Sequence, residues 1–127
     1  MISESMAVWM IAAAIVREAA DQPTEGKKAV AQVVVTRSIE WKKPINKVLV
    51  PSQFPWVNFH IAMMPKAHNE IDKAVQKEAL EIARAAYKGA KAKKLKKGKY
   101  LFFNTKPSGR KFKTEVPVVA IGAHYFY

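Results

Sequence analysis

The sequence predicts an α+β fold that is mainly α, with a small antiparallel β element near the C-terminus. Apolar residues recur at helical spacing in three long segments before residue 88, and short apolar runs alternate with turn residues after it. The chain has 127 residues, of which 50% are hydrophobic, enough to bury one core. We therefore expect a single domain over residues 1–127.

The first two predicted helices follow each other closely. Ser3 can cap a helix that runs to about Ala20, because its hydroxyl can accept a hydrogen bond from an unpaired amide of the first turn. Pro23 then ends this helix. A second helix is expected from near Thr24 to about Ile39, with an apolar stripe formed by Val30, Val33 and Val34.

A region rich in proline and aromatic residues comes next. Four prolines fall between Lys42 and His68, so we expect a loop region with short helical turns. A third long helix is predicted from about Asn69 to Tyr87, and Gly89 is expected to end it.

The C-terminal part of the chain predicts a loop and strands. The lysine-rich segment from Lys88 to Lys99 is expected to be a solvated loop. Two short strands are predicted in KYLFFN (residues 99–104) and VVAIGAHYFY (residues 118–127). The turn-rich segment TKPSGRK and a further stretch join them.

Composition excludes several classes of function. The chain has no cysteine, which rules out disulfides and thiolate chemistry. The three histidines, at positions 60, 68 and 124, show no ligand spacing, so we expect no metal and no cofactor. A net charge of +12 favours anionic partners such as nucleic acid, a membrane surface or the bacterial envelope. The apolar run from Ala7 to Val16 lacks a preceding basic region and is too short to span a bilayer, so no signal peptide is predicted.

Glu18 is the strongest candidate for chemistry. Ile11, Ala14 and Ile15 share its helical face, so the carboxylate lies at the end of an apolar stripe. Burial disfavours a charged carboxylate and raises its pKa, which suits a general acid. The alternative is that Glu18 lies at the rim of the core and pairs with Arg37 or a lysine.

Each of the other candidate site residues has both a functional and a purely structural interpretation. Gln53 lies beside Phe54 and Trp56, and amides next to aromatic faces suit sugar rings, although the two rings can also be core residues. Asn104 follows a run of aromatic residues, where it can point into a cleft or form a turn. His124 can shuttle protons or make a structural hydrogen bond.

Five of these segments, in order, resemble the SleB-type, spore-cortex-lytic cell wall hydrolase family. The resemblance extends from about residue 12 to the end of the chain. Its motifs are Glu18-Ala19, Gly26 with AVAQVVVTR, Gln53-Phe54, Phe102-Phe103-Asn104 and the terminal IGAHYF.

The resemblance implies a lysozyme-like fold and cleavage of peptidoglycan between N-acetylmuramic acid and N-acetylglucosamine. It assigns the role of catalytic acid to Glu18 and implies lytic transglycosylation, which needs one carboxylate. An ordinary hydrolysing muramidase usually needs two, and Asp21 is the only nearby candidate in the sequence. The expected substrate-binding residues are Gln53, Phe54, Trp56, Phe103, Asn104 and His124. The family often has Gly where this chain has Arg17, whose side chain we expect to point about 100° away from Glu18.

These expectations predict a phage-type endolysin, or a bacterial housekeeping enzyme. We expect synthesis in the cytoplasm, holin-type release, and action in the periplasm or cell wall as a monomer. The partners would be the peptidoglycan glycan strand and the anionic envelope, the latter through the basic surface, with no nucleic acid. The competing hypotheses are a basic nucleic-acid-binding protein and an inactive wall-binding relative.

Overall fold

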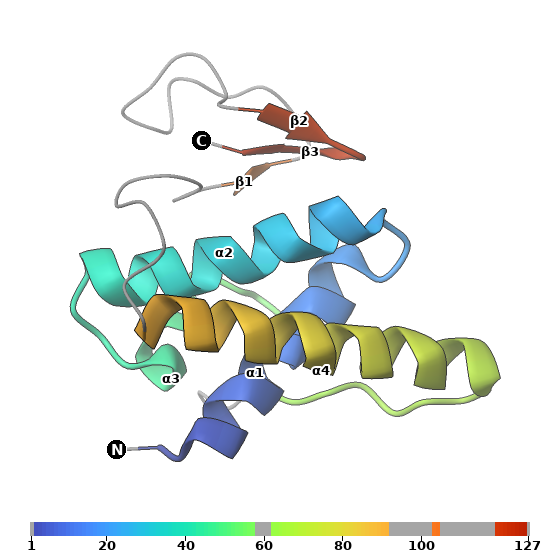
Figure 1. Cartoon of the computed structure of the whole chain (residues 1–127), viewed down its shortest axis with the longest axis horizontal. Coiled ribbons are helices and arrows are strands. Elements are labelled where there is room, and N and C mark those ends of the chain that lie inside the picture. Colours follow the sequence, from blue (N-terminus) through green and yellow to red (C-terminus); the bar gives the residue numbers. More distant parts are fainter. Residues whose placement is uncertain (1, 58–61, 92–102, 105–118, 127) are drawn as a thin grey trace.

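The computed structural model describes residues 2–57, 62–91, 103–104 and 119–126. Figure 1 shows helices packed together on one side and a small sheet on the other. The elements are α1 (Glu4–Ala19), α2 (Thr24–Glu40), α3 (Ile45–Val48), α4 (Glu70–Lys91), β1 (Phe103–Asn104), β2 (Val119–Ile121) and β3 (His124–Phe126). The predicted class, α+β and mainly α, is confirmed.

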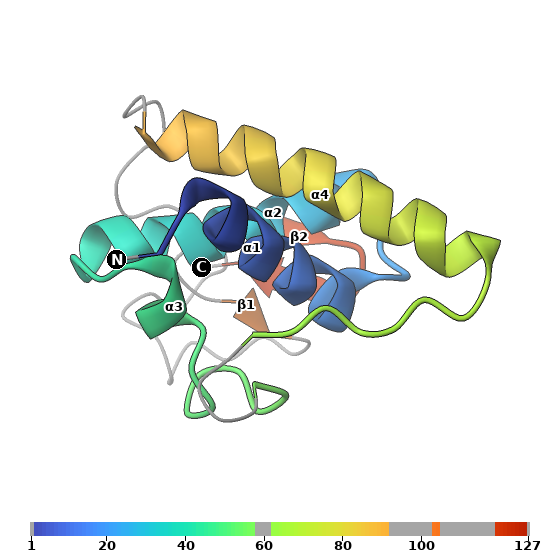
Figure 2. The ribbon, with the colours of Figure 1, turned by 90° about the horizontal axis from the view of Figure 1, so that it is seen from below.

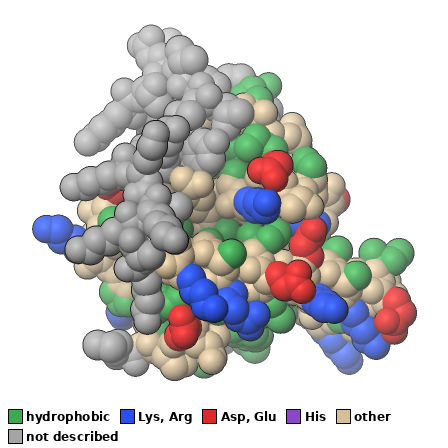
Figure 3. Space-filling view, in the orientation of Figure 1, with side chains coloured by type: hydrophobic (Ala, Val, Ile, Leu, Met, Phe, Trp, Pro, Cys, Tyr) green, Lys and Arg blue, Asp and Glu red, His purple; other side chains and the backbone are tan. Residues whose placement is uncertain are grey.

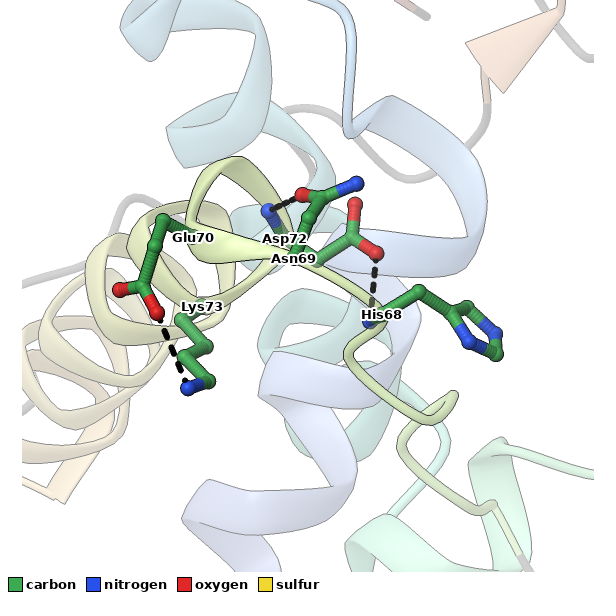
Figure 4. A network of polar contacts seen from close by, with 5 residues as sticks. All are labelled: His68, Asn69, Glu70, Asp72 and Lys73. Atoms are coloured by element: carbon green, nitrogen blue, oxygen red, sulfur yellow. Dashed lines mark hydrogen bonds and ion pairs between the residues drawn. The ribbon is translucent and has the colours of Figure 1, made fainter.

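The helices begin where local signals place them. The Ser3 hydroxyl accepts a hydrogen bond from the Met6 amide (3.1 Å) at the start of α1, as predicted. Pro23 directly precedes α2. At the start of α4, the Asn69 side chain accepts a hydrogen bond from the Asp72 amide (2.8 Å), a contact drawn in Figure 4. The short α3 confirms the helical turn expected in the proline-rich region.

The predicted end of α4 is wrong. The helix continues through Gly89 to Lys91, so the first four residues of the predicted basic loop belong to the helix. A glycine costs a helix only about 1 kcal/mol relative to alanine, so it does not by itself end one. Residues 92–99 of that loop lie outside the described residues.

The second predicted strand is in fact a hairpin. Gly122 has a φ of 58°, a left-handed conformation that suits glycine, and the chain reverses there between β2 and β3. The sheet is antiparallel in the order β1-β3-β2, with Ile121 opposite His124. Gln22 anchors the turn, because its Oε1 accepts a hydrogen bond from the Ala123 amide (2.7 Å).

Helix α1 lies inside the helical layer, packed against both α2 and α4 (Figures 1 and 2). Its residues from Ala12 to Ile15 are fully buried. The sheet lies over α2, on the opposite side from α3 (Figure 1). There Phe126 packs in a second apolar cluster with Ala19 and Val30. The last turn of α1 therefore lies beside the junction of helices and sheet.

A polar contact joins α2 to α4. The Lys27 ammonium, on an almost fully buried side chain, lies 2.6 Å from Glu78 Oε1. The Thr24 hydroxyl donates to Glu78 Oε2 (2.9 Å). Neither long helix can slide along the other without breaking these contacts. Of the helices that the structure describes, none combines the length and apolar character that crossing a bilayer requires.

Candidate functional site

Glu18 lies in the last turn of α1 and is half-buried. Its Oε1 accepts a hydrogen bond from the indole Nε1 of Trp56 (2.9 Å). Trp56 belongs to the loop after α3, 38 residues further along the chain. The helix end and the proline-rich loop thus meet at this carboxylate.

Phe54 supports the tryptophan. Its ring is 1% exposed, belongs to the main core cluster and contacts the Trp56 ring edge-on, with centroids 6.0 Å apart. The prediction that Phe54 contacts the sugar is therefore corrected, because the core already covers its faces. The alternative of a core aromatic applies to Phe54, whereas Trp56 keeps part of its surface exposed.

Arg37 provides a buried positive charge near the carboxylate. Its side chain comes from α2, is 6% exposed, and its guanidinium lies over the rings of Trp41 (5.3 Å) and Phe54 (5.4 Å). Burial lowers the pKa of Arg37 to about 10, and the negative charge of Glu18 acts in the opposite direction and raises it. Arg37 therefore stays charged at neutral pH and interacts electrostatically with Glu18. Direct pairing of the two side chains, the alternative considered from the sequence, stays a prediction.

Arg17 does not simply point away from the site. Its guanidinium lies 5.8 Å from the centre of the Trp56 ring, and its Nε and Nη2 donate to the Met63 carbonyl (both 3.4 Å). Neighbouring helix positions differ by about 100°, but one large indole can contact both. Trp56 therefore meets Glu18 through its N–H and Arg17 through its ring.

The remaining loop candidates are more exposed. Gln53 is exposed in the turn before Phe54, where its backbone amide donates to the Val50 carbonyl (3.0 Å). Asp21, the candidate second carboxylate, is exposed and accepts a hydrogen bond from the Gln22 side chain (3.1 Å). Gln53 is thus accessible to a ligand, and Asp21 likewise has one oxygen occupied and one without a hydrogen bond among the described residues.

The sheet candidates lie around a small aromatic cluster. Phe103 is half-buried, contacts the His124 ring edge-on (5.2 Å) and stacks on Phe126 (5.8 Å). His124 is 6% exposed, and within the described part of the chain its Nδ1 has no hydrogen-bond partner. The predicted bracing hydrogen bond is therefore not made through Nδ1. The backbone of Asn104 pairs with Tyr125 in the sheet.

The sequence indicated Arg37 only as a partner of Glu18 and did not predict its burial over two aromatic rings, and it predicted that Arg17 points away from the site. Arg37 ends the motif AVAQVVVTR, three residues after Val34 on a buried helix face, and this spacing could have shown that its side chain enters the core. Nothing local could have placed Arg17 on Trp56, because the contact depends on the path of the loop. In residues 2–57, 62–91, 103–104 and 119–126, His, Asp and Glu side chains form no group of three that could hold a metal ion.

Comparison with known proteins adds one finding. A family model described as Cell Wall Hydrolase matches residues 21–127, which contain Gln53, Trp56, Phe103 and His124 but not Glu18. No curated protein and no solved structure matches the chain, so the lysozyme-like architecture stays a prediction. The match covers most of the sequence, and it agrees with the resemblance of the motifs. The chain therefore belongs to the SleB-type cell wall hydrolase family, whose activity is the degradation of peptidoglycan.

Proposed function

We propose that residues 1–127 form one catalytic domain that cleaves the peptidoglycan glycan strand between N-acetylmuramic acid and N-acetylglucosamine by lytic transglycosylation, with Glu18 as the catalytic acid. The observation that carries the proposal is the hydrogen bond from Trp56 Nε1 to Glu18 Oε1 (2.9 Å). This contact holds one carboxyl oxygen. Among the described residues, no hydrogen bond occupies Oε2, so this oxygen is available to carry a proton to the substrate.

The reaction needs only this carboxyl group. Protonated Glu18 transfers its proton to the glycosidic oxygen as the bond to C1 of the muramoyl residue breaks. The resulting carboxylate then accepts the proton of the muramoyl C6 hydroxyl, whose oxygen attacks C1 and closes a 1,6-anhydro ring. Water is not consumed and Glu18 ends protonated, as it began. The nearby charge of Arg37 stabilises the carboxylate between the two steps.

Three features support the one-acid scheme and the assigned sugar contacts. Asp21 is exposed in the turn after α1 and does not receive the hydrogen bond of the Trp56 indole, so it does not share the surroundings of Glu18, and we assign it no role as a second carboxylate. Trp56 and Gln53 keep exposed surface in the loop that contacts Glu18. Phe103 lies in the sheet, which packs against Ala19 through Phe126. We expect Trp56, Gln53 and Phe103 to contact the sugars, and we keep Asn104 and His124 as further candidates for binding the strand.

We further propose that the enzyme is a monomeric endolysin that reaches the wall after holin-type release, and that its net charge of +12 favours the anionic envelope. The charge is not uniform on the surface. On the face drawn in Figure 3, Lys and Arg side chains lie among Asp and Glu side chains over α4. One such pair on α4 is Lys73–Glu70. This mixed face is a poor surface for nucleic acid, which favours a continuous basic stripe.

Digestion of purified peptidoglycan, followed by mass spectrometry of the soluble muropeptides, tests the function. Transglycosylation gives anhydro products, one water lighter than hydrolysis products and without a reducing end. Reducing products would instead indicate a muramidase and a second carboxylate, with Asp21→Asn as the first variant to test. No release, combined with cosedimentation with sacculi, would indicate an inactive wall-binding relative. No release combined with a salt-dependent DNA shift would indicate a nucleic-acid-binding protein.

A further inference from the structure

A hollow beside Arg17 is lined by neither Glu18 nor Trp56. It measures about 480 Å³ and lies between the last turn of α1, the segment before α4 and the first turns of α4. Sites for small ligands typically measure about 300–1,000 Å³. Its charged and polar lining consists of Arg17, Lys66, His68, Asp72 and Gln76.

The wall of this hollow is held in place by hydrogen bonds from both helices. Gln76 Nε2, on α4, donates to the Pro65 carbonyl (2.7 Å). The His68 amide donates to Asp72 Oδ2 (2.8 Å), and Figure 4 shows the His68 imidazole pointing away from the helix. On the other side, Arg17 donates to the Met63 carbonyl. The site is thus formed before any ligand arrives, which lowers the entropic cost of binding.

The charges in the hollow favour an acidic ligand. Lys66 is exposed and makes no ion pair with the residues that the structure describes. The guanidinium of Arg17 carries five N–H groups, and the Met63 carbonyl engages only part of them. Asp72 is the one acidic residue of the lining, and its Oδ2 already accepts the His68 amide. The remaining lining is apolar, with Val16, Ala20, Pro65 and Val75.

The hollow is joined to the candidate active site through one side chain. Arg17 lines the hollow and also lies over Trp56, whose indole donates to Glu18. In peptidoglycan, a short peptide stem is attached to the muramic acid, one of the two sugars at the proposed scissile bond. The stem consists of small and acidic residues with free carboxylates. A site for the stem must therefore lie next to the catalytic acid, be cationic and accept small apolar groups.

We propose that this hollow binds the peptide stem of the substrate, with Arg17 and Lys66 as partners of its carboxylates. The proposal rests on the proposed function, because it assumes that the substrate strand carries muramic acid. Because Arg17 contacts both the stem and Trp56, it holds the stem beside the tryptophan. The sugar that bears the stem then lies at Glu18. The stem thereby sets which glycosidic bond of the glycan strand lies at Glu18.

Kinetics on two substrates test the proposal. One substrate is a soluble glycan strand that retains its stems, and the other is the same strand after an amidase has removed them. Lys66→Glu is expected to raise KM on the stem-bearing strand about fivefold to tenfold, with kcat and the activity on stripped strands unchanged. Lys77→Glu is the matched control, because Lys77 is an exposed lysine of α4 outside the hollow. An equal change in KM on both substrates, or no change on either, would overturn the proposal.

A binding measurement separates this proposal from the proposed function. Calorimetric titration of the wild-type protein with a soluble stem tetrapeptide of alanine, glutamate, diaminopimelate and alanine needs no catalysis. We expect binding that Lys66→Glu weakens about fivefold to tenfold and that Lys77→Glu leaves unchanged. If the protein cleaves no strand but binds the tetrapeptide in this way, the assignment of the reaction fails and the stem site stands. If it cleaves strands but does not bind the tetrapeptide, the stem site fails.

Discussion

Glu18 and Glu78 are both half-buried beside neighbouring helices, but the protein satisfies their carboxylates differently. Glu78 uses both oxygens, one toward Lys27 (2.6 Å) and one toward Thr24 (2.9 Å). The hydrogen bond from Lys27, followed by that from Thr24, lowers the pKa of Glu78 below its ordinary value. Glu18 accepts one hydrogen bond from Trp56, at Oε1.

This difference separates a structural carboxylate from one suited to chemistry. A carboxylate with both oxygens occupied stabilises its ionised form and has no site for a transferable proton. One with a single oriented oxygen keeps the other available to a substrate. The four predictions below test this distinction, beginning with the largest expected effect.

Glu18→Gln should lower the rate of wall lysis by about 100-fold or more, because an amide cannot donate the proton. Its free energy of unfolding should stay within about 1 kcal/mol of wild type, since the amide oxygen can still accept the Trp56 N–H. Turbidity loss of purified sacculi measures the first quantity and urea unfolding the second. Glu78→Gln is the matched control and should lyse sacculi at the wild-type rate. Full activity of Glu18→Gln would remove Glu18 from the mechanism.

Glu78→Ala should reverse this pattern, with activity kept and stability reduced. It leaves the Lys27 ammonium, whose side chain is 9% exposed, without its partner, at a cost of about 1–3 kcal/mol. Lys27→Met should cost less, because it removes the buried charge and keeps an apolar chain, while Glu78 stays solvated. Urea unfolding of the two variants measures the difference. Equal losses would mean that burial of the charge contributes little to the effect.

Trp56→Phe should lower kcat about tenfold, because the carboxyl of Glu18 loses the contact that orients it. The phenyl ring still offers Arg17 a face, so the fold should be retained. Initial rates of muropeptide release measure this effect, and circular dichroism confirms the fold. An unchanged kcat would show that the hydrogen bond to Oε1 does not position the acid.

The smallest expected effect is the pH dependence of what Glu78 contributes to the free energy of unfolding. A carboxylate whose pKa is lowered by folding stabilises the protein above its ordinary pKa of 4.5, and this contribution is lost as pH falls through the folded value. At pH 7, wild type should therefore have a higher unfolding free energy than Glu78→Gln. The difference should be less than about 1 kcal/mol, because Glu78 is partly solvated, and it should shrink below pH 4.5. Urea unfolding at pH 7 and at pH 3 measures it. A difference that grows in acid would contradict the assigned direction.

Local signals predicted the helices well because their causes are local. Ser3 and Pro23 lie next to the helices they delimit, and the apolar spacing in α1 correctly placed its buried face. Glycine was a weaker guide. Gly89 lies inside α4, whereas Gly122 reverses the chain, and the same residue type serves both positions because the surroundings decide its conformation.

The sequence by itself determined the fold class, the start of each long helix and the place of Glu18 at the end of an apolar stripe, because capping and helical periodicity act within a few residues. The tertiary structure alone decided which side chains surround that carboxylate. Trp56 reaches it from 38 positions away, Phe54 is buried beneath the tryptophan, and Arg17 lies on the indole. These contacts depend on the path of a proline-broken loop, which is set by packing between distant segments and not by local preference.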